Sequence, residues 1–417
     1  MSRRRHSTPA PATAAPLDDE DLLREILLRL PPNPSSFPRA SLVCKRWRGI
    51  LSDPRFRRRF RKHHRRSPLL GFFLKQWNAA PVFAPLLDPP DCIPVALPEN
   101  IGGGIRWDFS FSFHGCRHGV AVFLDRKRPE VFLWDTLTAV QRRVHMPPSF
   151  AFDHHDTNGT ALSAAVLCAD SDDCHLTPFK LALTSQNSDR TKTSVCLYES
   201  NTGVWGDIMS ITTAGGILSA ILSQRPSVLV GNALCWLLSG GGILKFDFQR
   251  QTLVVIDKLA DLHFTGPEEV LWSYQILRGE DGGPGLAVLS VSELSIQLWA
   301  RKSDGDGVAS WVLQKTVQLD ERFLRHGYPV VQMLGYDEDT NAIFLSSGYD
   351  DFTLQLESMK FKCTRRGYYM RDRIYHPYTS FYTAEKMVSP PEVTSYICRL
   401  LLLVGREIAG GAENVNT

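Results

Sequence analysis

Histidine, cysteine and acidic residues that could bind a metal stand together at two places in this sequence. His154-His155-Asp156 and Cys174-His175 contain side chains of the kinds that hold zinc. Adjacent residues of a strand point to opposite sides, however, and neither group has a second pair at zinc-binding spacing. The glycine triplets at 102–104 and 240–242 flank apolar runs, and we interpret them as turns. Dinucleotide, P-loop, metalloprotease and serine-hydrolase motifs do not occur in the sequence. We therefore expect no catalytic residue, metal or cofactor.

A dense basic segment, Arg55 to Arg66 (RFRRRFRKHHRR), could bind anions or serve as a nuclear-import signal. Its Phe56 and Phe60 stand four residues apart, which is the spacing of a core-facing side of a helix. We therefore favour a solvated helix and keep import or anion binding as the alternative. The residues of that alternative are Arg57, Arg58, Arg59, Arg61, Lys62, Arg65 and Arg66.

Two amphipathic segments precede the basic run. Apolar residues between Leu22 and Leu30 fall on an arc of about 140° of a helix. Acidic residues at 18–21 suit the N-terminal end of its dipole, and Pro31 ends it. A second apolar stripe runs from 40 to 51, and Asp53-Pro54 is typical of a helix start. A unit of about 50 residues buries only a modest core. We therefore expect a partner protein to cover the surplus apolar surface.

The order of these elements between residues 17 and 56 resembles an F-box. After the Leu-rich helix and its proline stop come Ala40-x-x-Val43-Cys44-x-x-Trp47-Arg48 and Asp53-Pro54-x-Phe56, although Pro16-Leu17 stands where a Leu-Pro pair often opens the motif. The resemblance implies docking on a Skp-type adaptor and, through it, on a cullin–RING ubiquitin ligase. The adaptor-binding residues that it implies are Leu22, Ile26, Leu27, Leu30, Pro31, Val43 and Trp47.

Composition and charge describe an ordinary globular chain with an uneven charge distribution. Of its 417 residues, 43% are hydrophobic and 22% charged, and no run approaches the roughly 20 apolar residues that span a bilayer. Residues 1–66 contain 17 Lys and Arg against 6 Asp and Glu, whereas residues 67–417 contain 30 against 38. Nine cysteines without a Cys-x-x-Cys pair indicate reduced thiols in a cytoplasmic or nuclear protein.

After Pro68 the helical periodicity gives way to short apolar runs between turn residues. We predict strands over 120–124, 131–135, 179–184, 194–199, 228–238, 243–248, 252–256, 286–291, 294–299 and 342–347. A strand, a polar turn and a second strand recur in 132–144, 197–205, 246–253 and 334–340, with 298–313 as a further copy. The spacing of these copies is compatible with propeller blades of about 40–50 residues plus loops.

Residues 116–121 and 129–135 resemble the opening blade, and 230–236 a later blade, of the kelch-like F-box-associated propellers of plants. The predicted fold class is α+β and multidomain: a small three-helix F-box followed by a large all-β propeller of about six or seven blades. A pair of β-sandwiches is the structural alternative. We expect disordered tails over 1–16 and 406–417, the F-box and basic helix over 17–66, and the propeller over 67–405.

Together the two resemblances predict a non-catalytic substrate-recognition subunit of an SCF-type ubiquitin ligase. The propeller would hold a target protein, of unknown identity, so that its lysines are concentrated near the charged ubiquitin-conjugating enzyme. The alternatives are a propeller that acts as an enzyme or binding protein by itself, and a nucleic-acid-associated factor that uses residues 55–66. We expect neither nucleic acid nor a membrane among the partners.

Overall fold

The structure is a computed structural model, and it forms two compact units. The helical unit consists of the residues up to Ser67 and a short segment that begins at Phe381, and the β unit extends from Pro68 to Ser380. The structure describes residues 19–381 apart from 76–80, 94, 96–110, 126, 137–138, 151–160, 169–177, 213–218, 223, 260–266, 280, 304–308, 326–327 and 367–372. The predicted tails, 1–16 and 406–417, therefore lie outside the described residues.

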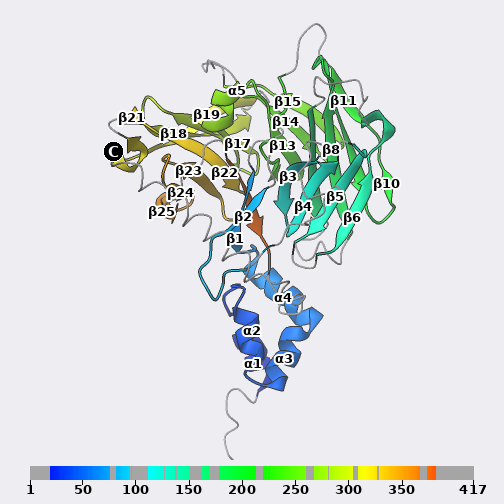
Figure 1. Cartoon of the computed structure of the whole chain (residues 1–417), viewed down its shortest axis with the longest axis vertical. Coiled ribbons are helices and arrows are strands. Elements are labelled where there is room, and N and C mark those ends of the chain that lie inside the picture. Colours follow the sequence, from blue (N-terminus) through cyan, green and yellow to red (C-terminus); the bar gives the residue numbers. More distant parts are fainter. Residues whose placement is uncertain are drawn as a thin grey trace, which may run out of the picture. The chain divides into compact units, whose positions relative to one another are not determined.

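Four helices make up the described part of the helical unit (Figure 1): α1 (Glu20–Leu28), α2 (Ser36–Ser41), α3 (Lys45–Ser52) and α4 (Pro54–His64). Asp19 caps α1 by accepting hydrogen bonds from the backbone N–H groups of Asp21 and Leu22. Asp53 caps α4 in the same way through Arg55, with proline at the first helical position. The second predicted stripe is split, because an extended Cys44 separates α2 from α3.

The core of the helical unit is small and largely aromatic at one end. The ring centroids of Phe37 and Phe60 lie 4.6 Å apart, and Phe381 lies 6.4 Å from Phe60. Phe381 therefore contributes to this core although it follows the whole β unit in the sequence. The buried members are Leu23, Leu27, Leu28, Phe37, Ala40, Ile50, Leu51, Phe56 and Phe60.

The β unit is a propeller of six blades, each an antiparallel sheet (Figure 1). The first blade contains β26 (Ile374–Thr379), β1 (Leu69–Lys75) and β2 (Val82–Pro85). The second contains β3 (Phe111–Arg117), β4 (Val120–Asp125), β5 (Glu130–Asp135) and β6 (Gln141–His145). The third contains β7 (Ala161–Cys168), β8 (Phe179–Gln186) and β9 (Lys192–Glu199), with β10 (Val204–Trp205) and β11 (Met209–Thr212) both paired to β9.

The remaining blades repeat a regular four-stranded pattern. The fourth contains β12 (Val228–Val230), β13 (Ala233–Leu237), β14 (Ile243–Asp247) and β15 (Thr252–Ile256). The fifth contains β16 (Tyr274–Arg278), β17 (Pro284–Ser290), β18 (Ser295–Ser303) and β19 (Ala309–Gln318). The sixth contains β22 (Gln332–Asp337), β23 (Ala342–Ser346), β24 (Asp351–Gln355) and β25 (Lys360–Arg365). The connections hold the short helix α5 (Pro267–Ser273), the 3₁₀ turns η1 (Pro148–Phe150) and η2 (Glu321–Phe323), and the hairpin of β20 (Leu324–Arg325) and β21 (Tyr328–Pro329).

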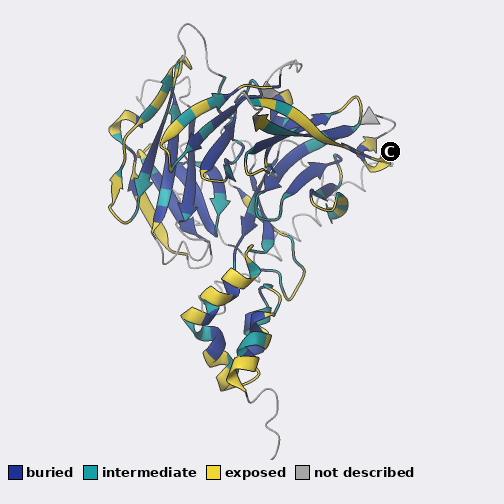
Figure 2. Ribbon diagram, turned by 180° about the vertical axis from the view of Figure 1, so that it is seen from behind, coloured by how far each residue is buried: buried dark blue, intermediate teal, exposed yellow. Residues whose placement is uncertain are grey.

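The ring of blades closes by pairing the two ends of the β unit. β26 pairs antiparallel with β1, in a register that sets Ile374 opposite Lys75 and Thr379 opposite Leu69. The inner strands β26, β3 and β7 are neighbours, as are β12, β16, β22 and β26. Figure 2 shows that the strands are mostly buried, and the outermost strands such as β6 and β19 carry more exposed residues. Each described blade therefore has two short edge strands, an inner one beside the inner strands of other blades and an outer one at the rim, which radial closure keeps short and protected.

The predicted strands are present, except that 228–238 forms a hairpin of β12 and β13 and not one strand. One copy of the predicted repeat has a different place in its blade. Three copies form the hairpin between the third and fourth strands of their blades: 132–144, 197–205 and 246–253. The copy at 334–340 instead joins the first and second strands of the sixth blade. Both kinds of turn begin with an aspartate: Asp247 accepts from the backbone N–H groups of Gln249 and Arg250, and Asp337 from those of Asp339 and Thr340. The shared turn chemistry explains why the two hairpins look alike in sequence.

Candidate functional site

The apolar stripe of α1 is divided between the core and the solvent. Leu23 and Leu27 are fully buried, whereas Leu22 and Ile26 are 43% and 39% exposed. The exposed pair is spaced four residues apart and therefore forms one patch on the outer side of the helix. The burial pattern of α1 can be followed in Figure 2. The helix thus contributes to a core with one side and presents aliphatic surface with the other.

A second exposed apolar pair, Leu42 and Val43, lies in the link between α2 and α3. These side chains are 78% and 60% exposed. Val43 was predicted from the motif, whereas Leu42 was not. The only signal for Leu42 in the sequence is its place beside Val43 in a stripe that breaks at Cys44. An exposed pair of this kind at a helix break is unusual for a helical unit that has a core of its own.

The other predicted adaptor-binding residues have three different environments. Pro31 is exposed, and Leu30 and Trp47 are half-buried against the core of the helical unit. Leu27 was predicted as a contact residue, but it has no exposed surface and belongs to the core. A helical wheel places Leu27 on the apolar side, and it does not show which edge of that side faces inward.

Ion pairs hold α1 and α4 together at the surface of the helical unit. Arg24 contacts Glu20 at 2.9 Å and Asp53 at 3.5 Å, while Glu25 pairs with Arg29 at 3.0 Å and also with Arg59. These side chains are all partly exposed, so each pair contributes about 1 kcal/mol or less. They fix the approach of the two helices without using the exposed aliphatic pairs.

The predicted anion-binding residues of α4 and of the two positions after it also differ in their environments. Arg57 donates to the carbonyl of Leu51 at 2.8 Å, and Arg61 is buried. Arg59 is exposed and pairs with Glu25. Arg58, Lys62, Arg65 and Arg66 are exposed.

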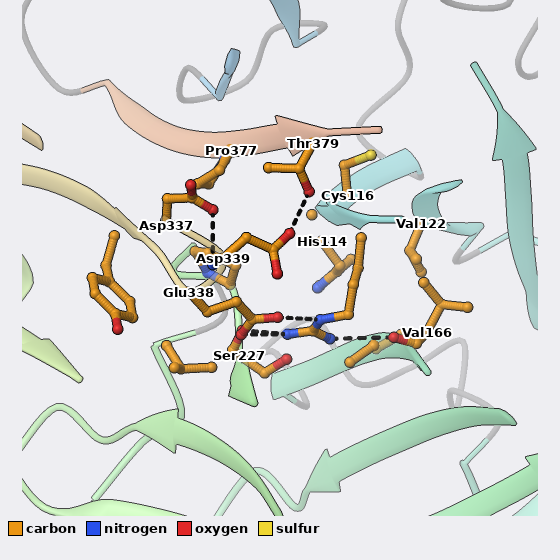
Figure 3. A pocket seen from close by; sticks show the side chains of 17 residues that line it. His114, Cys116, Val122, Val166, Ser227, Asp337, Glu338, Asp339, Pro377 and Thr379 are labelled. Carbon is orange, nitrogen blue, oxygen red and sulfur yellow. Dashed lines mark hydrogen bonds and ion pairs between the residues drawn. The ribbon is translucent and has the colours of Figure 1, made fainter. Parts of the chain in front are cut away.

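In the β unit, the side chain of Arg117 joins four blades beside the pocket drawn in Figure 3. Its guanidinium contacts Glu338 at 2.7 Å and 3.2 Å and donates to the carbonyls of Val166 at 3.2 Å and Ser227 at 3.0 Å. Glu338 also accepts from the backbone N–H of Leu229 at 2.6 Å. Because the partners come from β3, β7, the segment at β12 and the turn after β22, this network cross-links the ring.

Burial and neighbouring charge act in opposite directions on the carboxyls of this network. Burial alone would raise the pKa of Glu338, but the charge and hydrogen bonds of Arg117 lower it below its ordinary value. Burial raises the pKa of Asp337 to about 7, and the adjacent Asp339 adds to the rise. The cavity beside these residues measures about 50 Å³, which is room for a few water molecules. The arrangement is therefore suited to holding blades together.

Two further buried centres link the blades. Arg225, which is 2% exposed, donates to Gln275 at 2.9 Å and to backbone carbonyls that include that of Met333 at 2.6 Å. Burial lowers the pKa of Arg225 to about 9. Asp351 accepts from Arg373 and from the hydroxyl of Tyr375, and thereby fastens the closing strand β26 to the sixth blade.

Among the described residues, no group of three or more His, Cys, Asp or Glu side chains could hold a metal ion. His154-His155-Asp156, Cys174-His175 and the triplet 102–104 lie outside the described residues, whereas 240–242 forms the β13–β14 turn, with φ +82° at Gly241. Six of the described cysteines are free, whereas Cys168 is disulfide-bonded, which differs from the expectation of reduced thiols. No helix in the described part is long and apolar enough to cross a membrane.

Comparison with known proteins gives the family. Residues 19–59 match the F-box domain, and residues 113–360 match the beta-propeller described as F-box protein AT5G49610-like. The second match covers more than half of the chain. This protein belongs to the F-box protein AT5G49610-like propeller family. Its combination of an F-box with a propeller supports a general role in substrate recognition within SCF-type ligases.

Two solved structures show low similarity to this family member. A structural-genomics protein of unknown function from Bacteroides thetaiotaomicron is 17% identical, with a TM-score of 0.33 over 66% of this chain and 61% of that one. BBS1N, solved in complex with ARL6DN, is 7% identical, with a TM-score of 0.29 over 56% of this chain and 60% of that one. The chain thus spans about three fifths of each of those two chains. No curated protein matches it.

Proposed function

We propose that this protein is the substrate-recognition subunit of an SCF-type cullin–RING ubiquitin ligase. The observation that carries the proposal is the exposed aliphatic surface of the helical unit, formed by Leu22, Ile26, Leu42 and Val43, within a segment that matches the F-box. Covering these side chains with a partner's apolar surface removes their remaining exposed area from water, and each contributes a fraction of the about 1.5–3 kcal/mol that full burial of such a side chain gives. The partner is a Skp-type adaptor, which connects the protein to the cullin.

The predicted contact residues have two roles in this proposal. The exposed residues contact the adaptor: Leu22, Ile26, Pro31, Val43 and, in addition to the predicted set, Leu42. Leu27, Leu30 and Trp47 belong to the core or pack against it, so they support the contact surface from beneath. Substitution of a supporting residue alters the fold as well as binding, and only the exposed residues separate the two effects.

The propeller serves to bind the target protein, whose identity is unknown. The target's lysines are then held near the thioester of the ubiquitin-conjugating enzyme, which raises their effective concentration. This role requires no nucleophile, metal or cofactor from the chain itself. It places the protein in the cytoplasm or the nucleus, where such ligases act.

The proposal is tested by assembly of the complex from purified components. The full chain, a Skp-type adaptor and a cullin are mixed and separated by size-exclusion chromatography. Wild type is expected to co-elute with both, and Leu42→Asp/Val43→Asp to elute alone, because two carboxylates would be buried without partners. The matched control Val140→Asp/Val254→Asp changes two exposed valines of the propeller, one just before β6 and one in β15, and should assemble like wild type. Failure of folded wild type to assemble would refute the proposal.

A further inference from the structure

The outer side of α4 carries cations that the fold does not use. Arg55, Arg58 and Lys62 fall within about 60° of the helix at 100° per residue. Phe56 and Phe60, which pack in the core, lie on the opposite side. Neither these three cations nor Arg65 forms an ion pair with any carboxylate of the described residues. We call Arg55, Arg58 and Lys62 the cationic stripe.

Other basic residues of the same helix make contacts that stabilise the helical unit. Arg57 bonds the carbonyl of Leu51, Arg59 pairs with Glu25, and Arg61 is buried. In contrast, the stripe places like charges three and four residues apart, which destabilises a helix. Arg55 also stands at the positive end of the helix dipole, where a cation is unfavourable. The stripe therefore opposes the stability of the helical unit instead of supporting it.

An acidic protein and a nucleic acid would require different side chains around the cationic stripe. Protein interfaces depend on a few apolar or aromatic anchors surrounded by polar groups. The exposed side of α4 has no Phe, Tyr, Trp, Leu, Ile, Val or Met side chain, and apart from Pro54 its exposed residues are Arg55, Arg58, Arg59, Lys62 and His63. Binding of a nucleic-acid backbone requires only a row of cations that neutralise successive phosphates. The planar guanidinium of arginine fits a phosphate group with two hydrogen bonds.

We propose that the cationic stripe of α4 is a sequence-independent binding site for the phosphate backbone of nucleic acid. Its three cations extend over about 10 Å along a straight helix, and Arg65 and Arg66 continue the positive charge beyond its end. The imidazole of His63 is the single exposed ring of α4, so affinity rests mainly on phosphate contacts and depends little on base sequence. The site is separate from Leu22, Ile26, Leu42 and Val43 and goes beyond the ligase function.

The test uses fluorescence anisotropy of a labelled 20-base-pair DNA duplex of arbitrary sequence, titrated with the full chain at several salt concentrations. The stripe variant is Arg55→Gln/Arg58→Gln/Lys62→Gln. The matched control, Lys192→Gln/Arg250→Gln/Lys315→Gln, removes three exposed cations from three blades of the propeller. The stripe variant should bind at least tenfold more weakly, and the slope of log K against log salt should fall by up to about 3. The control should match wild type.

Three results would overturn the proposal. Folded wild type could show no salt-dependent binding, the control could lose as much affinity as the stripe variant, or poly-glutamate could compete as well as unlabelled duplex, which would indicate an acidic protein partner.

The stripe variant should melt at the same temperature as wild type or higher, because like charges are removed. If the triple variant unfolds, Arg58→Gln/Lys62→Gln provides the same comparison, and unchanged affinity of that folded variant would also refute the site. Adaptor binding, measured in parallel, should be unchanged.

Discussion

The helical unit and the propeller use apolar and charged side chains in opposite ways. The helical unit leaves Leu22, Ile26, Leu42 and Val43 exposed, while its ion pairs lie at the surface. The propeller buries the pair of Arg373 and Asp351, each with 1% of its side chain exposed. The network of Arg117 and Glu338 is nearly as enclosed.

This difference separates surfaces that serve a partner from contacts that serve the fold. An exposed aliphatic side chain adds little to the stability of the isolated protein and becomes valuable only when a partner covers it. A buried charge pair adds little net stability when intact, but loss of one member leaves the other buried without a partner. Substitutions in the two regions should therefore have opposite effects on binding and on folding.

The largest expected effect is on the closing strand of the propeller. Asp351→Ala leaves the guanidinium of Arg373 buried without its carboxylate, and the free energy of unfolding should fall by about 3–5 kcal/mol. Urea unfolding followed by tryptophan fluorescence measures this loss. The control Asp281→Ala removes a 68% exposed carboxylate that pairs with Lys302, and it should cost less than about 1 kcal/mol. Equal losses in the two variants would contradict the buried cross-link.

Within α1, the same residue type should behave differently on the two sides of the helix. Leu27→Ala creates a cavity in the core and should cost the helical unit about 2–5 kcal/mol. Leu22→Ala, at an exposed position, should cost about 0.5 kcal/mol or less. Thermal unfolding followed by far-ultraviolet circular dichroism compares them. Similar melting curves for the two variants would show that the apolar stripe is not divided as described.

The buried turn after β22 should give the propeller a pH dependence. The folded carboxyl of Asp337 keeps its proton up to about pH 7, whereas the unfolded one loses it near about pH 4. Between these values the folded state binds more protons, so the free energy of unfolding falls as the pH rises.

Asp337→Asn removes this titration while keeping a carbonyl oxygen that can accept hydrogen bonds in the turn. The stability of the variant relative to wild type should therefore increase between about pH 4 and 7, by up to about 1.4 kcal/mol per pH unit. Denaturant unfolding at pH 4, 5, 6 and 7 measures the difference. A constant difference across this range would contradict the raised pKa.

The smallest effect is expected at the surface of the helical unit. Glu25→Gln breaks the ion pairs with Arg29 and Arg59, but all three side chains are at least one third exposed. The melting temperature should fall slightly, corresponding to less than about 1 kcal/mol, and the shift should shrink further in high salt. A loss comparable to that of Asp351→Ala would remove the contrast between the two units.

The elements of this fold were predictable from local sequence, because alternating apolar residues and aspartate-led turns specify strands and hairpins within a few residues. The place of a hairpin in its blade was not, since Asp247 and Asp337 begin turns of the same chemistry. The wheel of α1 gave the apolar side but not its inward edge, so the buried Leu27 could not be distinguished from the exposed Leu22 and Ile26. The pairing of Arg117 with Glu338 joins residues 221 apart and has no local signal.

The central claim is that the exposed side of α1 binds a Skp-type adaptor, and isothermal titration calorimetry tests it most directly. Purified adaptor is titrated into wild type, into Leu22→Asp/Ile26→Asp, and into the propeller control Val140→Asp/Val254→Asp. The account predicts binding by wild type and control with the same Kd, and a loss of about 100-fold or more for the α1 variant with its melting temperature retained. Equal binding by all three, or no binding by folded wild type, would contradict the account.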